Sequence, residues 1–374
     1  MGNEKRYIDV DGHILERHGL WEDYIEPKYR ARALKILEDE EGLEYLSVDG
    51  QPSWFFRGGT LGALGAIGQD VQPFREPGRI KWEDPILPRG GYDPHERVKV
   101  MDAEGIDQTL VYPSLGLGWE EQCADIELAA ANCRAYNNWL FDFCKARPDR
   151  LIPVAHITTL DVDEAVKELR RTARLGAKAA MIEGTCPSRR AFGSRYFDPL
   201  WKEAEGIGIP VTIHPVGAVP DCLYPNKEDC TSWWIFALGG EIIKFQFTTF
   251  LNEGTFERFP KLKLVILESS TGWLVPWLQR LDSKFDLYGF TTPMKMLPSE
   301  YFLRNCWIAM DPDEEMVHFN VEHLDDSRIL WAYDYPHSDS VTDPVKKLDE
   351  NLAPLPPESR RRIASENAVE LYGL

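Results

Sequence analysis

Short apolar runs rich in β-branched residues alternate with helical stretches along the chain. Several of these runs are followed at once by a turn signal, as in Tyr112-Pro113 and His214-Pro215. Strands that alternate with helices predict a parallel sheet, and eight repeats predict a single (β/α)8 barrel. The eight runs lie at residues 7–10, 109–112, 152–155, 179–182, 211–213, 264–267, 307–310 and 329–333.

Helices are predicted between the strands at residues 121–145, 161–175 and 198–206, and after the last strand at residues 357–372. The segment 161–175 has apolar residues at helical spacing, Asp163 as the candidate cap and Gly176 as its end. The helix at 357–372 would seal the barrel.

Two stretches interrupt this alternation. Residues 45–95 follow strand one and are rich in glycine, proline and aromatic residues, whereas residues 216–250 follow strand five and contain Trp233, Trp234 and Phe236. Barrel enzymes place substrate loops at the carboxyl ends of their strands, so we expect both insertions to cover the site. The alternative is an ordinary surface excursion packed by its own aromatic side chains. Residues 1–374 are expected to form one domain.

Composition narrows the function classes. The net charge of −19 argues against a nucleic-acid partner, because such a protein needs a basic face. The seven cysteines are odd in number and contain no CxxC pair, which favours a reducing compartment, so a cytoplasmic protein is expected. The sequence contains no apolar run long enough to suggest a membrane span, and its first residues do not resemble an export signal.

Four candidate metal ligands lie at the ends of three predicted strands. Asp11 and His13 end strand one and share a face of an extended chain, His214 ends strand five, and Asp334 ends strand eight. Because all three strand ends meet at one mouth of a barrel, these side chains form a candidate mononuclear site with positions left for water or substrate. Carboxylate and imidazole ligands suit Zn, Mn or Fe. We expect one divalent ion, with Zn favoured, and no organic cofactor.

The chain resembles the second amidohydrolase family, that of aminocarboxymuconate-semialdehyde decarboxylase and its relatives. The motifs that carry the resemblance are spread over nearly the whole chain: residues 9–13 (Asp-Val-Asp-Gly-His), 209–215 (Ile-Pro-Val-Thr-Ile-His-Pro), 268–273 (Glu-Ser-Ser-Thr-Gly-Trp), 280–282 (Arg-Leu-Asp), 334–337 (Asp-Tyr-Pro-His) and 366–368 (Glu-Asn-Ala). The resemblance implies a distorted barrel, one divalent metal held at the positions of Asp11, His13, His214 and Asp334, and a homodimer.

Two positions depart from many relatives. Asp11 is a shorter carboxylate at a position where they have His or Glu, so its coordination of the metal is the least secure of the four. Glu268 stands where they have a His at the end of strand six. Glu268 is a candidate acid or base, or alternatively a structural partner in a hydrogen bond or ion pair.

Other residues are assigned by position. His337 lies in the same loop as Asp334 and either contacts substrate or locks the loop, and we favour locking. His156 follows strand three and is expected to line the pocket wall. The candidate catalytic residues are Asp334, Glu268 and His214, and the candidate substrate-binding residues are His337 and His156. An arginine of the first insertion could bind a substrate carboxylate through two hydrogen bonds, but none of these arginines is named as a site residue.

Two reactions share such a metal site. In one, a small cyclic or aromatic acid loses carbon dioxide without an organic cofactor. In the other, metal-bound hydroxide attacks an amide, a lactone or a similar bond. The sequence leaves decarboxylation and hydrolysis nearly level, and a barrel that only binds a ligand is a third alternative.

Overall fold

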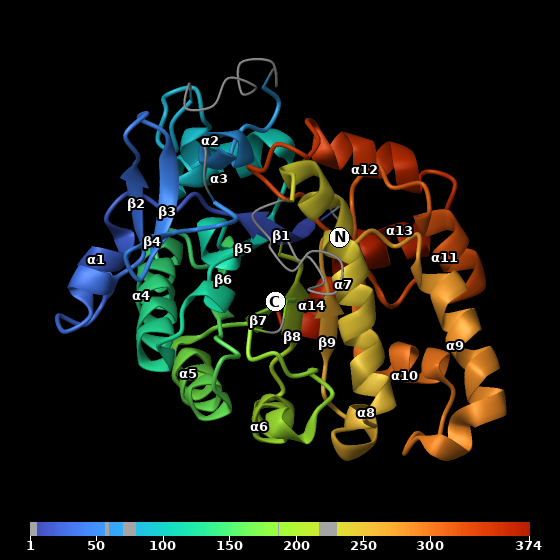
Figure 1. The fold of residues 1–374 in the computed structure, drawn as a ribbon. Coiled ribbons are helices and arrows are strands. Elements are labelled where there is room, and N and C mark those ends of the chain that lie inside the picture. Colours follow the sequence, from blue (N-terminus) through green and yellow to red (C-terminus); the bar gives the residue numbers. More distant parts are fainter. Residues whose placement is uncertain (1–5, 57–59, 70–79, 186, 217–229) are drawn as a thin grey trace.

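The computed structural model describes residues 6–56, 60–69, 80–185, 187–216 and 230–374. Its main sheet has eight parallel strands, and each strand pairs with the next one along the chain. Helices surround these strands on all sides (Figure 1), so the predicted (β/α)8 barrel is confirmed. The strands are β1 (Ile8–His13), β5 (Gln108–Tyr112), β6 (Leu151–His156), β7 (Ala179–Glu183), β8 (Val211–His214), β9 (Leu264–Ile266), β10 (Cys306–Met310) and β11 (Ile329–Trp331).

The barrel closes between β1 and the segment that follows β11. The backbone N–H of Asp334 donates to the carbonyl oxygen of Asp11 at 2.8 Å, and that of His13 donates to the carbonyl oxygen of Tyr335 at 2.6 Å. The buried Arg97 guanidinium donates to the carbonyl oxygen of His13 at 2.6 Å and lies 4.4 Å from the centre of the Tyr335 ring. These contacts hold the carboxyl ends of the two strands side by side.

Helical segments connect consecutive strands. The four predicted helices are found, although the last is two α-helices joined by a π-helical turn. In α5 the cap is Asp161, whose side chain accepts from the N–H groups of Asp163 and Glu164, so the expected cap at Asp163 is wrong by two residues. The longer helices are α3 (Pro94–Glu104), α4 (Ile126–Cys144), α5 (Val162–Leu175), α6 (Asp198–Ile207), α7 (Ser232–Asn252), α9 (Leu274–Tyr288), α10 (Pro298–Asn305), α11 (Val317–His323) and α12 (Pro344–Leu352), and the shorter ones include α8 (Thr255–Arg258), α13 (Pro357–Arg361) and α14 (Asn367–Tyr372).

The two predicted insertions contain regular structure. Between β1 and β5 lie α1 (Leu20–Tyr24), α2 (Thr60–Leu64) and a small antiparallel sheet of β2 (Lys35–Glu38), β3 (Glu44–Val48) and β4 (Gln51–Pro52). Since β2 precedes residue 45, regular structure begins earlier than the predicted boundary. After β8, residues 232–252 form the helix α7. Among the helices described, none is both long enough and apolar enough for a membrane span.

A bulge in β1 decides where its polar side chains lie. The pairing register with β5 shifts between Asp9 and Gly12, because β1 has one extra residue there. Ile8 and Val10 pack in the barrel interior, and strict alternation would then turn His13 outward. The extra residue returns His13 to the interior, where its ring centre lies 6.0 Å from that of Tyr112.

Gly12 makes room for the polar contacts beneath this bulge. The Thr109 hydroxyl donates to the Asp9 carboxylate at 2.6 Å. A Cβ on Gly12 would lie 2.2 Å from Thr109 Oγ1, 2.4 Å from Arg97 Nη2 and 2.7 Å from Asp9 Oδ2. All three neighbours are buried, so a methyl group has no free space.

We therefore expect Gly12→Ala to lower the free energy of unfolding by about 1–3 kcal/mol through overpacking. Gly206→Ala is the matched control, because its added Cβ meets nothing within 4 Å and alanine is the better helix former. Denaturant unfolding of both variants checks this expectation, and equal stability of Gly12→Ala and the parent protein would contradict it.

Candidate metal centre and active site

Four ligand-type side chains from three strand ends meet inside the mouth of the barrel. His13 Nε2 lies 2.9 Å from Asp334 Oδ1, 3.5 Å from Asp11 Oδ1 and 3.3 Å from His214 Nε2. His214 Nε2 lies 3.6 Å from Asp11 Oδ2. The structure thus brings together all four residues predicted as metal ligands.

Alternation along β8 explains the position of His214. Val211 and Ile213 pack outward among the helices, so Thr212 and His214 face the barrel axis. Asp334 is placed differently, because it follows β11 and adopts a left-handed backbone conformation with φ of 59°. Non-glycine residues in this conformation are held there by their surroundings and are concentrated at functional sites.

The hydrogen bonds of the two histidines fix which nitrogen faces the site. His13 Nδ1 lies 2.6 Å from the carbonyl oxygen of Pro113, and His214 Nδ1 lies 2.7 Å from that of Pro215. A carbonyl oxygen only accepts, so each Nδ1 carries the proton and each Nε2 presents a lone pair. Burial lowers the pKa of His214 to about 3 and holds the pKa of His13 well below its ordinary value, so both rings are neutral near pH 7.

Three carboxylate oxygens of the site are buried beside histidine nitrogens. Among the described residues, Asp11 Oδ1, Asp11 Oδ2 and Asp334 Oδ1 have no partner with hydrogen-bond geometry. Burial is the largest cause that raises the pKa of each group, and nearby acids add to it. Two imidazole lone pairs and two buried carboxyl groups that face one another fit a divalent cation, which would displace any proton between them.

His337 contacts Asp334 and is itself anchored by Ser114. His337 Nδ1 lies 3.0 Å from Asp334 Oδ1, and its Nε2 lies 2.8 Å from the hydroxyl of Ser114, which donates to the carbonyl oxygen of Ile14. The rings of His337 and His13 stack with centres 4.0 Å apart. His337 is therefore built into the support of the site and also lines its cavity.

Glu268 reaches the same cluster from the loop after β9. Its Oε2 lies 3.2 Å from His214 Nε2, and a ligand-type atom of Glu268 lies within 4.8 Å of those of Asp334 and Asp339. Burial raises the pKa of Glu268 well above its usual value, and Asp339, Asp11 and Asp311 raise it further. A carboxyl group whose pKa is raised in this way is suited to proton transfer.

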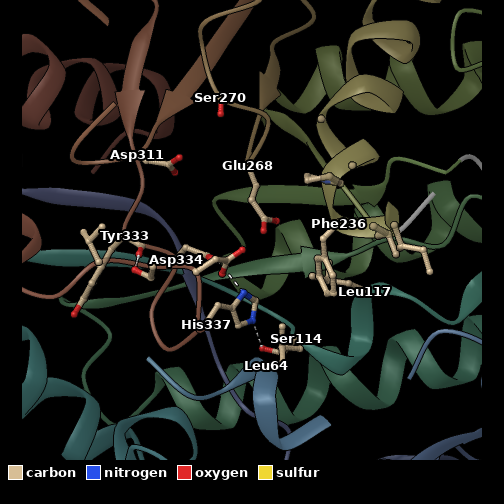
Figure 2. Close-up of a pocket in the computed structure, with 18 of the residues that line it drawn as sticks. Leu64, Ser114, Leu117, Phe236, Glu268, Ser270, Asp311, Tyr333, Asp334 and His337 are labelled. Carbon is tan, nitrogen blue, oxygen red and sulfur yellow. Dashed lines mark hydrogen bonds and ion pairs between the residues drawn. The ribbon is translucent and has the colours of Figure 1, made fainter. Parts of the chain in front are cut away.

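A cavity of about 270 Å³ opens onto this cluster. In Figure 2, Phe236 and Leu117 lie on one side of it and Asp311 and Tyr333 on the other, with Glu268 and Asp334 between them. This volume is at the small end of the range for sites that take one small molecule, which would then contact the cluster. Its apolar lining includes Phe55, Phe56, Leu64, Leu117, Pro215, Val216, Ile235 and Phe236, and its acidic lining is Glu268, Asp311, Asp313, Asp334 and Asp339.

Residues from both predicted insertions meet at this cavity. Phe55 comes from the segment after β3 and β4, Phe236 comes from α7, and their ring centres lie 5.8 Å apart. Of the arginines in the first insertion, Arg89 is exposed, whereas Arg57, Arg75 and Arg79 lie outside the described residues.

His156 is not among the residues that line the cavity, in contrast to the sequence prediction. Its Nε2 lies 2.8 Å from the buried Glu120 carboxylate, and its ring packs against Trp119 and Tyr136. The side chain of His156 is thus occupied by contacts within the protein, and we assign it no substrate contact.

Sequence reasoning missed Asp311 and Asp339. Asp311 directly follows β10, so the rule that identified Asp334 also applies to it. Asp339 lies in the loop after β11, and its position depends on how that loop folds back, for which the sequence offered no pattern.

Comparison with known proteins places the chain among metal enzymes of this architecture. The gamma-resorcylate decarboxylase of Rhizobium sp. (strain MTP-10005) is 25% identical over 301 residues, which cover 74% of this chain and 86% of that enzyme. A crystal structure of an amidohydrolase from Mycobacterium avium subsp. paratuberculosis K-10 superposes with a TM-score of 0.82 at 23% identity, covering 99% of this chain and 100% of that one.

A 5-carboxyvanillate decarboxylase from Novosphingobium aromaticivorans, complexed with manganese and 4-hydroxy-3-methoxy-5-nitrobenzoic acid, superposes with a TM-score of 0.71 at 20% identity. That alignment covers 100% of this chain and 97% of that one. A family model described as Amidohydrolase matches residues 8–374, nearly the whole chain. The chain therefore belongs to the amidohydrolase family and is a metal-dependent enzyme.

Proposed function

We propose that this enzyme removes carbon dioxide from a small hydroxylated aromatic acid, without oxidation and with one divalent cation held by Asp11, His13, His214 and Asp334. The observation that carries the proposal is the group of two imidazole lone pairs and two buried carboxylates beside a cavity lined by both apolar and acidic side chains. The names of the similar enzymes support the reaction, since they are decarboxylases of aromatic acids.

Asp11, His13, His214 and Asp334 would hold the cation, which would supply positive charge for binding the substrate's carboxylate. The remaining chemistry falls to the chain's own residues. Protonated Glu268 gives its proton to the ring carbon that bears the carboxylate. The bond from that carbon to the carboxylate then breaks, its electron pair restores the aromatic ring, and carbon dioxide leaves. Glu268 regains a proton from water, so no oxidant or reductant is consumed.

His337 acts on this reaction through Asp334. Its ring nitrogen, 3.0 Å from Asp334 Oδ1, limits the rotation of that carboxylate and fixes the direction in which Asp334 presents its oxygens. Partners of metal ligands commonly act in this way. We therefore propose a positioning role for His337, in agreement with the locking role favoured from the sequence.

The identity of the cation is a narrower proposal. Two imidazoles and two carboxylates suit zinc, manganese and iron. The sequence favoured zinc, whereas the superposed 5-carboxyvanillate decarboxylase binds manganese. We propose that manganese supports turnover, and zinc remains a prediction from the sequence.

Hydrolysis is the second candidate, and the acidic lining favours it. Besides Glu268 and the proposed ligand Asp334, the residues Asp311, Asp313 and Asp339 line the cavity, and the negative charge of these three repels a substrate carboxylate. A neutral amide or lactone would not meet this repulsion. The two reactions differ in the fate of water oxygen, which enters the product of hydrolysis only.

We also propose a covering role for the two insertions. Residues 45–95 and 216–250 cover the active site of one domain, which the contact between Phe55 and Phe236 over the cavity supports. A homodimer and a cytoplasmic location remain predictions from the sequence.

The proposed ligands are tested by metal content. His214→Ala removes one of four ligands, so we expect bound manganese to fall from about one ion per chain towards none after dialysis. His337→Ala leaves all four ligands and should weaken metal affinity by about 10–100-fold. His95→Ala, at an exposed position, is the control and should match the parent protein. Full metal content in His214→Ala would remove the basis of the proposal.

The reaction is tested with a panel of hydroxybenzoates, lactones and amides in ¹⁸O-labelled water with manganese present. We expect carbon dioxide to be released from at least one hydroxybenzoate, with no label in the ring product. Label entering a lactone or amide product, with no decarboxylation of any acid, would favour hydrolysis instead.

The role of Glu268 is tested by pH dependence. Burial raises the pKa of Glu268, so this carboxyl group holds its proton to a higher pH than an ordinary glutamate, and activity should be lost as pH rises through that pKa. Glu268→Gln cannot donate a proton and should lower kcat by about 100-fold or more, while its bound manganese stays near one ion per chain. If Glu268→Gln retains the parent kcat and pH profile, the carboxyl group is only structural.

A further inference from the structure

Two adjacent glycines, Gly239 and Gly240, lie inside the long helix α7 and both line the cavity. Glycine weakens a helix relative to alanine, so a glycine in a helix interior calls for a steric reason. The two positions have different reasons.

Close packing explains Gly240. A Cβ there would lie 3.1 Å from the carbonyl oxygen of Ser269 and 3.3 Å from its Cα. Ser269 directly follows Glu268, so the small residue lets α7 approach the loop that carries this acid. A larger side chain would push that loop away.

Packing does not explain Gly239. Among the residues that the structure describes, the nearest atom to a Cβ at this position is Pro215 Cβ at 3.4 Å, which is an ordinary contact distance. Alanine would therefore fit the protein itself and would strengthen the helix. The space in front of Gly239 is part of the cavity, and the neighbouring cavity residues Ile235, Val216 and Phe236 make this side apolar.

The opposite side of the cavity is polar. In Figure 2, Asp311 lies across the cavity from Phe236 and Leu117. Asp313 and Asp339 also line the cavity, and both interact electrostatically with Asp311. An aromatic acid bound at the cluster between the two sides would direct hydroxyl groups towards the acids, which accept hydrogen bonds, and an apolar substituent towards α7.

We propose that Gly239 determines substrate size, and that the substrate is a hydroxylated aromatic acid with an alkyl or alkoxy substituent that lies against Gly239. This inference rests on the proposed decarboxylation. It assigns the open space in front of Gly239 to a part of the substrate.

The test measures kcat/KM for three hydroxybenzoates that carry hydrogen, methyl or ethyl at one ring position. The proteins compared are the parent, Gly239→Ala and Gly239→Leu, each with manganese bound. We expect the parent to prefer the alkylated acids. Gly239→Ala should lower kcat/KM for the ethyl acid by about 10-fold relative to the unsubstituted acid, and Gly239→Leu by about 100-fold. Gly206→Ala, on another helix surface with nothing within 4 Å of its Cβ, should leave the ratio unchanged.

Gly240→Ala separates size selection from displacement of the loop. It should lower kcat/KM for all three acids by the same factor, because it moves the Glu268 loop and leaves the alkyl space open. If Gly239→Ala likewise lowers all three equally, or alters none, Gly239 does not determine substrate size.

Binding separates a failure of this inference from a failure of the proposed function. If the parent decarboxylates no acid in the series, the proposed function fails. Gly239 is then tested directly by binding of nitrophenols to the manganese-bound protein. The nitrophenols carry hydrogen, methyl or ethyl at one ring position, and their affinities are compared. A selective loss of the ethyl compound in Gly239→Ala supports the size role, and equal affinities in the two proteins overturn it.

Discussion

The hydrogen bond from the Asp334 N–H to the Asp11 carbonyl oxygen closes the barrel, and the arrangement of the site depends on it. Asp11 and Asp334 are separated by more than 300 residues in the chain, yet their backbones are in direct contact. Arg97 secures the same junction through the carbonyl oxygen of His13 and the ring of Tyr335. The positions of three proposed ligands are thus fixed by the closure of the fold itself, before any ion is bound.

Charge is the second constraint on this site. Asp11, Asp334 and Glu268 are buried close together, and burial and mutual repulsion raise the pKa of all three. Three buried carboxylates are unfavourable without positive charge nearby, and the neutral histidines supply none. A divalent cation would neutralise two of the carboxylates, which leaves Glu268 as the group that keeps a proton. Metal binding and proton donation are therefore complementary uses of one acidic cluster.

The sequence predicted the barrel and the four-residue cluster because both depend on strand ends, which Ile213-His214-Pro215 and similar stretches mark clearly. It did not reveal the β1 bulge, because alternation indicates that Asp11 and His13 share a face but does not identify that face. His156 was misplaced because a strand end locates the backbone, whereas Glu120 decides where the side chain points. The helix α7 was missed because apolar residues occur on all its faces and hide the helical period.

The bulge also accounts for a short carboxylate at position 11. Aspartate reaches one methylene less far than glutamate, so it meets a shared cation only if its backbone is close. The extra residue in β1 and the hydrogen bond to the Asp11 carbonyl bring that backbone to the mouth of the barrel. The carboxylate then lies 3.5 Å from His13 Nε2 and 3.6 Å from His214 Nε2. Asp11, the least secure ligand on sequence grounds, is thus placed between both imidazoles by the local backbone.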